Sequence, residues 1–407
     1  MRAKHEGQLM ATRALAADRG RAVAGALGVV LCVHLVVTVV RAALSPEPAP
    51  EPVEPGPLLS AAQGAIDELA IQFHRPGPAP VLDVYEDLFR ALDPRVTVRV
   101  VVSDAADERA FDAARRAWGH PGPSVRYVRA GRPITSWIHD RLLVRAPATR
   151  GGALGLVAPL APQVGSRERV NDWRVPWILR DALGARARIS MAPFRMDGGD
   201  FIADDAHAFV SDRIARRNSD RQPNEARMWR SIEAVAGRPV VRLGTLADPA
   251  PDHHVGMYVA PLGGGRVAVG DPELGLDALR RAAVIDDTTA PLVTLGGEPL
   301  ALDASPSTLA RFHRVQERIR SAGLVVVRVP VVPSVEPYVW LSYTNAMFET
   351  RAGVLHVYMP AYGIDALDRA ATGAWERAGA VVHPIRVAGV FRMGGSVGCL
   401  TAVLSRR

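Results

Sequence analysis

Beyond residue 58, apolar side chains follow two spacings that alternate along the chain. Residues 83–93 (DVYEDLFRALD) and 105–119 (AADERAFDAARRAWG) carry apolar side chains at helical spacing. Each is followed by a short extended stretch, at 96–102 (VTVRVVV) and 124–130 (SVRYVRA). Apolar positions three or four residues apart bury one face of a helix, whereas short valine-rich runs suit a strand. The pattern therefore predicts two helix–strand pairs here.

The same order recurs without exact sequence repetition in the rest of the chain. It predicts helices over 171–183, 225–236, 307–322 and 366–379, a hairpin over 201–212, and strands over 240–243, 324–331, 354–360 and 380–387. Residues 296–307 (GGEPLALDASPS) are predicted to form a surface loop. Because no long break divides these units, the pattern indicates one α/β domain over residues 58–407.

An uncharged apolar stretch occupies residues 22–40, close to the roughly 20 residues that a membrane-spanning helix requires. Basic residues outnumber acidic ones in residues 1–21, so the positive-inside rule places this segment in the cytoplasm. Residues 41–57 are rich in proline and glutamate and are expected to form an extended linker. We therefore predict a single-pass anchor with the 58–407 domain outside the cytoplasm. A cleaved signal peptide with a secreted domain is the alternative.

Composition and charge narrow the classes of function. The chain is 48% hydrophobic and 22% charged, with a formal net charge of +7 spread over arginines throughout. No basic block with interleaved aromatic residues is present, so a nucleic-acid partner is not expected. His253 and His254 are neighbours without a third ligand at a recognisable spacing, and no phosphate-binding glycine motif ends in lysine. Neither a metal nor another cofactor is predicted.

Candidate chemistry concentrates at the C-terminus, in FRMGGSVGCLTAVLSRR. The two cysteines of the chain are too few for a disulfide framework, and Cys32 lies inside the apolar stretch. Cys399 is therefore the one thiol of the predicted soluble domain. Gly394 and Gly395 precede it and permit close backbone approach to a bound group. Spacing alone also allows a glycine turn before a final core strand.

The segment GGSVGCLT resembles the GGxxHC(I/M)T ending of agmatine and arginine deiminases, whose cysteine attacks a guanidinium carbon. Further segments resemble motifs of these enzymes in the same order: SWIHDRLLV (WxxD), MDGGDFIADD (EGG hairpin), HVGMYVAP (HxD strand) and WLSYTNAMF (SYxN strand). The chain is thus similar to the guanidino-group-modifying pentein superfamily, which also includes protein-arginine deiminases. The resemblance implies a five-unit α/β propeller of ββαβ units, here preceded by one N-terminal transmembrane helix.

The resemblance also implies roles for particular residues. Cys399 would be the nucleophile, Asp140 would grip the guanidinium, His254 would be the general acid and base, and Asp197 would orient His254. Asp200, Trp137, Asn345 and Gly395 would contact the substrate. The chemistry needs these residue types, because a planar, permanently charged guanidinium is held by carboxylates while a thiolate attacks its carbon.

Two positions depart from the pattern of these enzymes. Gly256 replaces the aspartate of the HxD motif, and Gly398 stands where the deiminases place histidine or arginine. Losing one charged hydrogen bond to a cation costs about 1.5–3 kcal/mol. Dimethylargininases also lack that aspartate. Both changes enlarge the pocket and favour a bulkier or N-substituted guanidine.

The leading prediction is a hydrolase acting on C–N bonds of guanidines, a deiminase. It would convert a peptidyl arginine or an arginine derivative to a ureido product, citrulline-like, plus ammonia. Two alternatives stay open: an amidinotransferase, which ends in a similar motif, and a catalytically dead, membrane-tethered binding protein.

Overall fold

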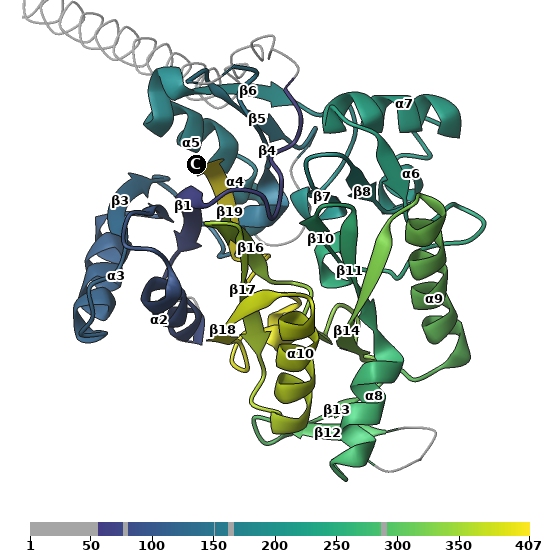
Figure 1. Cartoon of the computed structure of the whole chain (residues 1–407). Helices are drawn as coiled ribbons and strands as arrows, with labels where there is room; N and C mark the ends of the chain where they lie inside the picture. The colour runs from purple at the N-terminus through teal and green to yellow at the C-terminus, as the bar shows by residue number, and fades with distance from the viewer. Residues whose placement is uncertain (1–55, 76–79, 150, 162–166, 286–290) are drawn as a thin grey trace, which may run out of the picture. The chain divides into compact units, whose positions relative to one another are not determined.

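In a computed structural model, the described residues are 56–407 except 76–79, 150, 162–166 and 286–290, and they belong to one compact unit (Figure 1). The predicted cytoplasmic segment 1–21, the anchor 22–40 and nearly all of the linker 41–57 lie outside the described residues. None of the helices in the described part is long and apolar enough to cross a membrane.

Five of the six sheets in the described chain each contain an antiparallel strand pair joined to a parallel strand, and the sixth is the two-stranded pair of β12 and β13. In the first sheet, the order β19-β1-β2-β3 brings together Thr401–Arg406, Ile66–Phe73, Thr97–Val102 and Ser124–Arg129. The second comprises β4 (Leu143–Arg145), β5 (Leu154–Ala158) and β6 (Ala187–Met191), and the third β7 (Phe201–Ala203), β8 (Ala208–Val210) and β9 (Val240–Arg242). The fourth comprises β10 (Val259–Gly263), β11 (Arg266–Asp271), β14 (Val325–Pro333) and β15 (Trp340–Ser342), and the fifth β16 (Met347–Arg351), β17 (Val354–Ala361) and β18 (Ala380–Arg386).

Helices connect the parallel strands within the sheets. They are α2 (Pro80–Ala91), α3 (Ala105–Ala117), α4 (Arg167–Asp172), α5 (Val175–Leu183), α6 (Arg213–Arg217), α7 (Glu225–Ala236), α8 (Pro272–Arg281), α9 (Pro306–Ser321) and α10 (Asp365–Arg377). Short 3-10 turns are η1 (Ile138–Arg141), η2 (Gly184–Arg186), η3 (Gly198–Asp200), η4 (Val255–Met257) and η5 (Phe391–Met393). Figure 1 shows α3, α7, α8 and α9 at the periphery, while β4, β7, β10, β16 and β19 lie nearer the middle. The predicted α/β fold of five ββαβ-type units is confirmed in the described residues.

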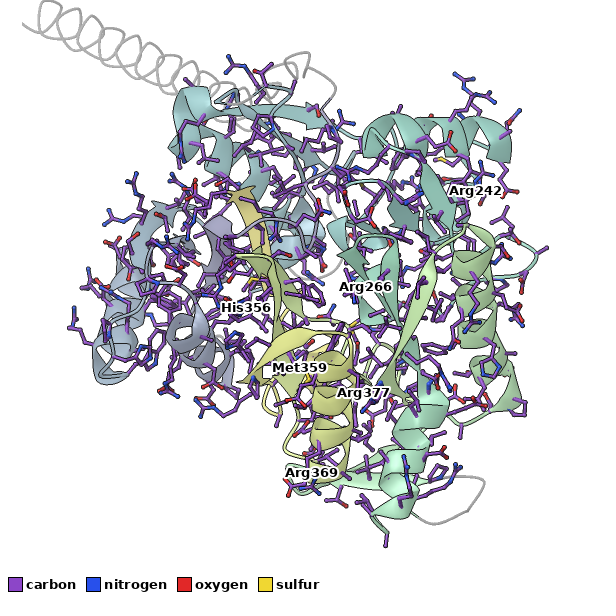
Figure 2. The ribbon with its side chains drawn as sticks, in the orientation of Figure 1. Arg242, Arg266, His356, Met359, Arg369 and Arg377 are labelled. Carbon is purple, nitrogen blue, oxygen red and sulfur yellow. The ribbon has the colours of Figure 1, made fainter. Side chains whose placement is uncertain are left out.

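Strand pairing closes the first sheet, and a side-chain hydrogen bond joins two of the other units. The last strand, β19, pairs antiparallel with β1, so the end of the chain completes the first sheet. Arg266 on β11 donates a hydrogen bond over 2.9 Å to the carbonyl of Ala378, at the end of α10 (Figure 2). This bond links the fourth unit to the fifth. Strands such as β5 and β10 are buried at every residue, whereas three of the six residues of β3 are exposed.

Three local predictions were wrong in detail. Residues 171–183 form the end of α4 and then a separate helix, α5, because Pro176 lies in the first turn of α5 and suits a helix start. The predicted loop 296–307 contains strand β13 (Glu298–Ala301), which pairs with β12 (Leu292–Leu295) in a hairpin. Gly296 and Gly297 make that turn with positive φ angles of 63° and 83°, the conformation that two-residue hairpins need. His254 precedes η4 instead of lying in a strand.

Candidate active site

Asp140 enters the site from the short turn η1, which follows β3 and precedes β4. Its flanking residue Ile138 is fully buried and anchors the turn. The Asp140 carboxylate is 3% exposed, and its Oδ2 lies 3.0 Å from Arg169 Nη1. Its Oδ1 lies 3.6 Å from His254 Nδ1. Asp140 therefore faces two cationic groups from other elements.

Asp197 precedes the turn η3 and Asp200 is its last residue, between β6 and β7. The amide of Asp197 donates to Asp200 Oδ2 over 2.8 Å, and the amide of Asp200 donates to the Asp197 carbonyl over 3.0 Å. A Cβ on Gly198 would lie 1.9 Å from the His139 carbonyl oxygen, and one on Gly199 would lie 2.6 Å from the His254 ring. The glycine pair therefore lets this turn pack directly against η1 and His254.

His254 lies between the two carboxylates, with Nε2 3.4 Å from Asp197 Oδ2 and Nδ1 3.6 Å from Asp140 Oδ1. Burial alone would lower the pKa of His254. Asp140, the hydrogen bond to Asp197 and a hydrogen-bonding interaction with Cys399 outweigh burial and raise that pKa well above 6.5. The imidazole is therefore protonated at neutral pH.

Nearby cations keep the two carboxylates ionised. Burial would raise the pKa of Asp140, but His254 and Arg141 hold that pKa below its ordinary value. The pKa of Asp197 is likewise lowered against burial, by His254 and Arg217. Both carboxylates are therefore ionised at neutral pH and available to hold a cation.

His253 has a different environment from its neighbour. Its Nδ1 accepts the His254 amide over 2.8 Å, which leaves Nε2 to carry the proton and donate to the Tyr338 carbonyl over 3.1 Å. Burial and the nearby His254 lower the pKa of His253 to about 3. His253 is thus a neutral support for the backbone at His254.

Cys399 lies in the turn between η5 and β19 and is 3% exposed. Its amide donates to the Ser396 carbonyl over 3.1 Å and to Asn345 Oδ1 over 3.4 Å. Its carbonyl accepts the His139 amide over 3.3 Å, which ties the cysteine turn to η1. A Cβ on Gly395 would lie 2.7 Å from the Trp137 ring and 3.1 Å from Cys399 Sγ, so glycine permits this approach.

Two cavities share Cys399 and His254 as lining residues. The larger, about 980 Å³, is called the polar cavity here; Trp137, Asp140 and Asp197 also line it. The smaller, about 130 Å³, is called the apolar cavity, and apolar side chains such as Leu142, Met347 and Phe348 line it. Both positions that depart from the deiminase motifs, Gly256 and Gly398, line the apolar cavity.

The structure therefore brings Asp140, Asp197, His254 and Cys399 together around one cavity, with Trp137 beside them. The other predicted substrate contacts adjoin these residues but do not line the polar cavity. Asn345 lines the apolar cavity and holds the cysteine turn through Oδ1, which also accepts the Ser396 hydroxyl over 2.9 Å. Asp200 is fully buried beneath Asp197, and Gly395 borders Trp137 and Cys399.

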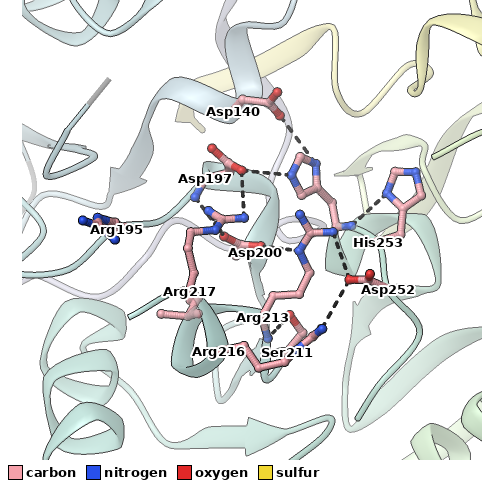
Figure 3. A network of polar contacts seen from close by, with 12 residues as sticks. Asp140, Arg195, Asp197, Asp200, Ser211, Arg213, Arg216, Arg217, Asp252 and His253 are labelled. Atoms are coloured by element: carbon pink, nitrogen blue, oxygen red, sulfur yellow. Dashed lines mark hydrogen bonds and ion pairs between the residues drawn. The ribbon is translucent and has the colours of Figure 1, made fainter. Parts of the chain in front are cut away.

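Sequence reasoning missed the arginines of the polar cavity: Arg169, Arg195, Arg213 and Arg217 line it. Arg217 bridges Asp197 Oδ2 and Asp200 Oδ2, each at 3.1 Å, as Figure 3 shows. The one available signal was the basic α6 segment, RIARR, shortly after the hairpin that supplies the two aspartates. Among the described residues, no group of three or more His, Cys, Asp or Glu side chains is arranged to hold a metal ion.

No family model matches the sequence, and no curated protein matches it either. Solved structures do match. An agmatine deiminase of Enterococcus faecalis has a TM-score of 0.61 at 14% identity, covering 87% of this chain and 96% of that one. An agmatine deiminase of C. jejuni has a TM-score of 0.60 at 13% identity, covering 86% and 96%. At these identities the likeness concerns the fold alone, and the chain has the fold of these agmatine deiminases, as the motif resemblance implies.

Proposed function

We propose that the protein is a guanidine-modifying hydrolase in which Cys399 is the nucleophile. The observation that carries this proposal is the position of His254, which lines the same cavity as Cys399 and is held between the carboxylates of Asp140 and Asp197. A thiol, a protonated imidazole and two ionised carboxylates around one cavity match what attack on a guanidinium requires. The fold shared with agmatine deiminases supports the same reading.

In the first half of the reaction, Asp140 binds N–H groups of the guanidinium and the Cys399 thiolate attacks its carbon. His254, protonated at neutral pH, gives its proton to the departing nitrogen, which leaves as ammonia or as an amine. The guanidinium carbon then remains bonded to Cys399 Sγ as a thiouronium group. Asp197 and Asp140 keep the His254 ring charged and oriented through this step.

In the second half, neutral His254 takes a proton from water as that water attacks the thiouronium carbon. The carbon–sulfur bond breaks, the thiolate is released, the second proton of the attacking water passes to solvent, and the product is a neutral ureido group. Water supplies the oxygen, so no oxidant or other co-reactant is needed. An amidinotransferase would instead use an amine at this step.

The size of the apolar cavity indicates which substituents the departing nitrogen of the substrate can carry. A dry, apolar cavity of about 150 Å³ can hold a ring the size of benzene, so a cavity of about 130 Å³ can hold a small alkyl group. Gly256 and Gly398 both border this space, and each has Asn345 Nδ2 near the position a Cβ would take, at 3.3 and 3.2 Å. We infer that the enzyme accepts guanidines with an apolar substituent on the departing nitrogen.

We also propose that residues 22–40 tether this domain to a membrane, with the active site outside the cytoplasm. The apolar length of the segment and the basic residues before it support this placement. Fractionation of the full-length chain tests it. Recovery of the whole chain in the soluble fraction would contradict it.

The functional proposal is tested by turnover. The full-length protein is incubated with arginine, agmatine, dimethylarginine and an arginine-containing peptide, while ureido product, ammonia and released amine are measured. We expect at least one of these to be hydrolysed. Cys399→Ala should abolish turnover, and Asp140→Asn should raise KM strongly. Transfer of the amidine to an added amine would instead support the amidinotransferase, and full activity of Cys399→Ala would refute the proposal.

A further inference from the structure

The polar cavity is bordered by an aromatic residue with an unusual backbone conformation. Tyr338 lies in the loop between β14 and β15, lines the cavity, and has a φ angle of 64°. A residue with a bulky side chain rarely adopts this left-handed conformation, which persists only where the surroundings hold it. Tyr338 is nevertheless 51% exposed. Burial of its ring therefore does not account for the strained backbone.

The His253 ring holds the Tyr338 backbone in place. His253 is 2% exposed, and its Nε2 donates to the Tyr338 carbonyl over 3.1 Å. The ring lies edge-on to the rings of Tyr338 and Trp340, with centroids 5.7 and 4.9 Å apart. Its other nitrogen, Nδ1, accepts the amide of His254 over 2.8 Å. One imidazole therefore fixes both the aromatic residue at the cavity edge and the backbone of the proposed acid and base.

Tyr338 brings apolar surface to a cavity that is lined by two aspartates and four arginines. Met393, which also lines this cavity, is 40% exposed. The next residue, Gly394, lies against Tyr338, because a Cβ on this glycine would be 3.5 Å from both the Cβ and the carbonyl oxygen of Tyr338. Two apolar side chains are thus exposed to water where the cavity meets solvent. A ligand with an apolar group at this point would remove that surface from water, which favours binding.

We propose that Tyr338 is a specificity-determining residue that binds an apolar group remote from the guanidinium of the substrate, and that His253 is the positioning residue that sets the separation of Tyr338 and His254. The charged head of such a substrate lies inside the cavity, and its apolar body lies at the solvent edge. The inference rests on the proposed function for the guanidinium and for the role of His254. The contact with Tyr338 can be measured without turnover.

Two matched ligands test this contact. N-benzoylarginine amide and N-acetylarginine amide have the same guanidinium and the same charge, and they differ in the apolar group far from it. With the full-length Cys399→Ala variant, titration calorimetry should show the benzoyl ligand binding about tenfold more tightly. Adding Tyr338→Asn should abolish this preference, because asparagine tolerates a positive φ but has no ring. Tyr338→Phe should keep the preference, as should the control Val335→Ala, at a 63% exposed residue of the same loop outside the cavity.

Two variants of His253 separate its two hydrogen bonds. Glutamine places a donor near the position of Nε2 and can hold the Tyr338 carbonyl, whereas asparagine places an acceptor near the position of Nδ1 and can hold the His254 amide. In the Cys399→Ala background, the preference for the benzoyl ligand should persist in His253→Gln and be lost in His253→Asn. With Cys399 intact, kcat should fall further in His253→Gln than in His253→Asn.

Equal binding of the two ligands, including no binding of either, would overturn the inference, and so would a preference that survives Tyr338→Asn. Equal effects of the two His253 variants would show a merely structural role and overturn the assignment of that residue. A chain that shows the expected preferences in binding but turns over no guanidine would keep this inference and refute the hydrolase.

Discussion

At the scale of single residues, His254 depends on its two carboxylate neighbours. A histidine buried among apolar groups would be neutral, as His253 is, but Asp140 and Asp197 reverse the sign of the shift at the adjacent position. Protonated His254 also stabilises the fold. Because its pKa is raised, this contribution is complete below about pH 6.5 and is lost as pH rises through the folded-state pKa.

The pH dependence of activity follows from this arrangement. Proton donation to the departing nitrogen requires protonated His254, so kcat should fall on the alkaline side, as pH rises through its raised pKa. Asp197→Asn removes a hydrogen-bonded anion and should move this alkaline limb to lower pH. A pH–rate profile measures the shift. Asp220→Asn, at an exposed aspartate paired with Arg195, is the control and should leave the limb unmoved; an unmoved limb in Asp197→Asn would contradict the assignment.

Gly256 can be tested by restoring the missing carboxylate. An added Cβ would meet only the Asn345 side chain, whose Nδ2 lies 3.3 Å away, so a small shift of that side chain is needed to admit it. In Gly256→Asp, a second charged contact to the guanidinium should lower KM for unsubstituted arginine by about 10- to 100-fold, corresponding to about 1.5–3 kcal/mol. Gly256→Asn has nearly the same shape without the charge. Equal KM values in the two variants would contradict a guanidinium contact at this position.

Sequence motifs located the residues proposed to react better than the residues that surround them. Asp140, Asp197, His254 and Cys399 each lie in a short segment with distinctive neighbours, and the order of those segments sufficed to group them. Arg169 and Arg195 had no such signal, because arginine occurs throughout the chain and only the fold brings these two to the cavity. The ion pairs around the polar cavity could therefore not be predicted from the sequence motifs.

At the scale of elements, two turns that are remote in sequence must touch for the site to exist. Turn η3 packs against η1 so closely that Gly198 has the His139 carbonyl where its Cβ would be. The contact sets the separation of Asp197 and Asp140, the two carboxylates around His254. Helices and strands with clear periodicity, such as α7 and β2, were predictable. The split between α4 and α5 was not, because helical spacing continues through Trp173 and Arg174.

Gly198→Ala tests the contact between these turns. The added methyl group would overlap a backbone oxygen that can move only with η1, so the free energy of unfolding should fall by about 1–3 kcal/mol or more. Gly373→Ala, inside α10 and near only the flexible end of Arg377, should instead raise it by about 0.5–1 kcal/mol. Chemical denaturation compares the two. Equal stability of Gly198→Ala and the unaltered protein would contradict this packing.

At the scale of the whole described unit, the chain closes on itself. The pairing of β1 with β19 joins residues such as Ile66 and Arg406, which are near opposite ends of the domain. Local periodicity predicts that both strands exist but carries no information about a partner so far away in sequence. The order of the family motifs implied this closure only through the fold to which they belong.

Arg406 should matter for closure. Its guanidinium donates to the carbonyls of Ala61 and Gly64, before β1, and to that of Phe348 on β16. Arg406→Ala leaves these acceptors without this donor, and the free energy of unfolding should fall by about 3 kcal/mol. Arg369→Ala, at an arginine on the surface of α10 that is labelled in Figure 2, should cause no measurable change. Similar denaturation midpoints for the two variants would contradict this role of Arg406.

The central claim, that Cys399 attacks a guanidinium carbon, is tested most directly by quenching the full-length protein with acid during turnover of arginine. Peptide mapping by mass spectrometry should find an amidine adduct on Cys399. In His254→Gln the adduct should not form from arginine, because no group protonates the departing nitrogen in the first step. Turnover at the wild-type rate by Cys399→Ala, with no adduct on the wild-type cysteine, would contradict the account.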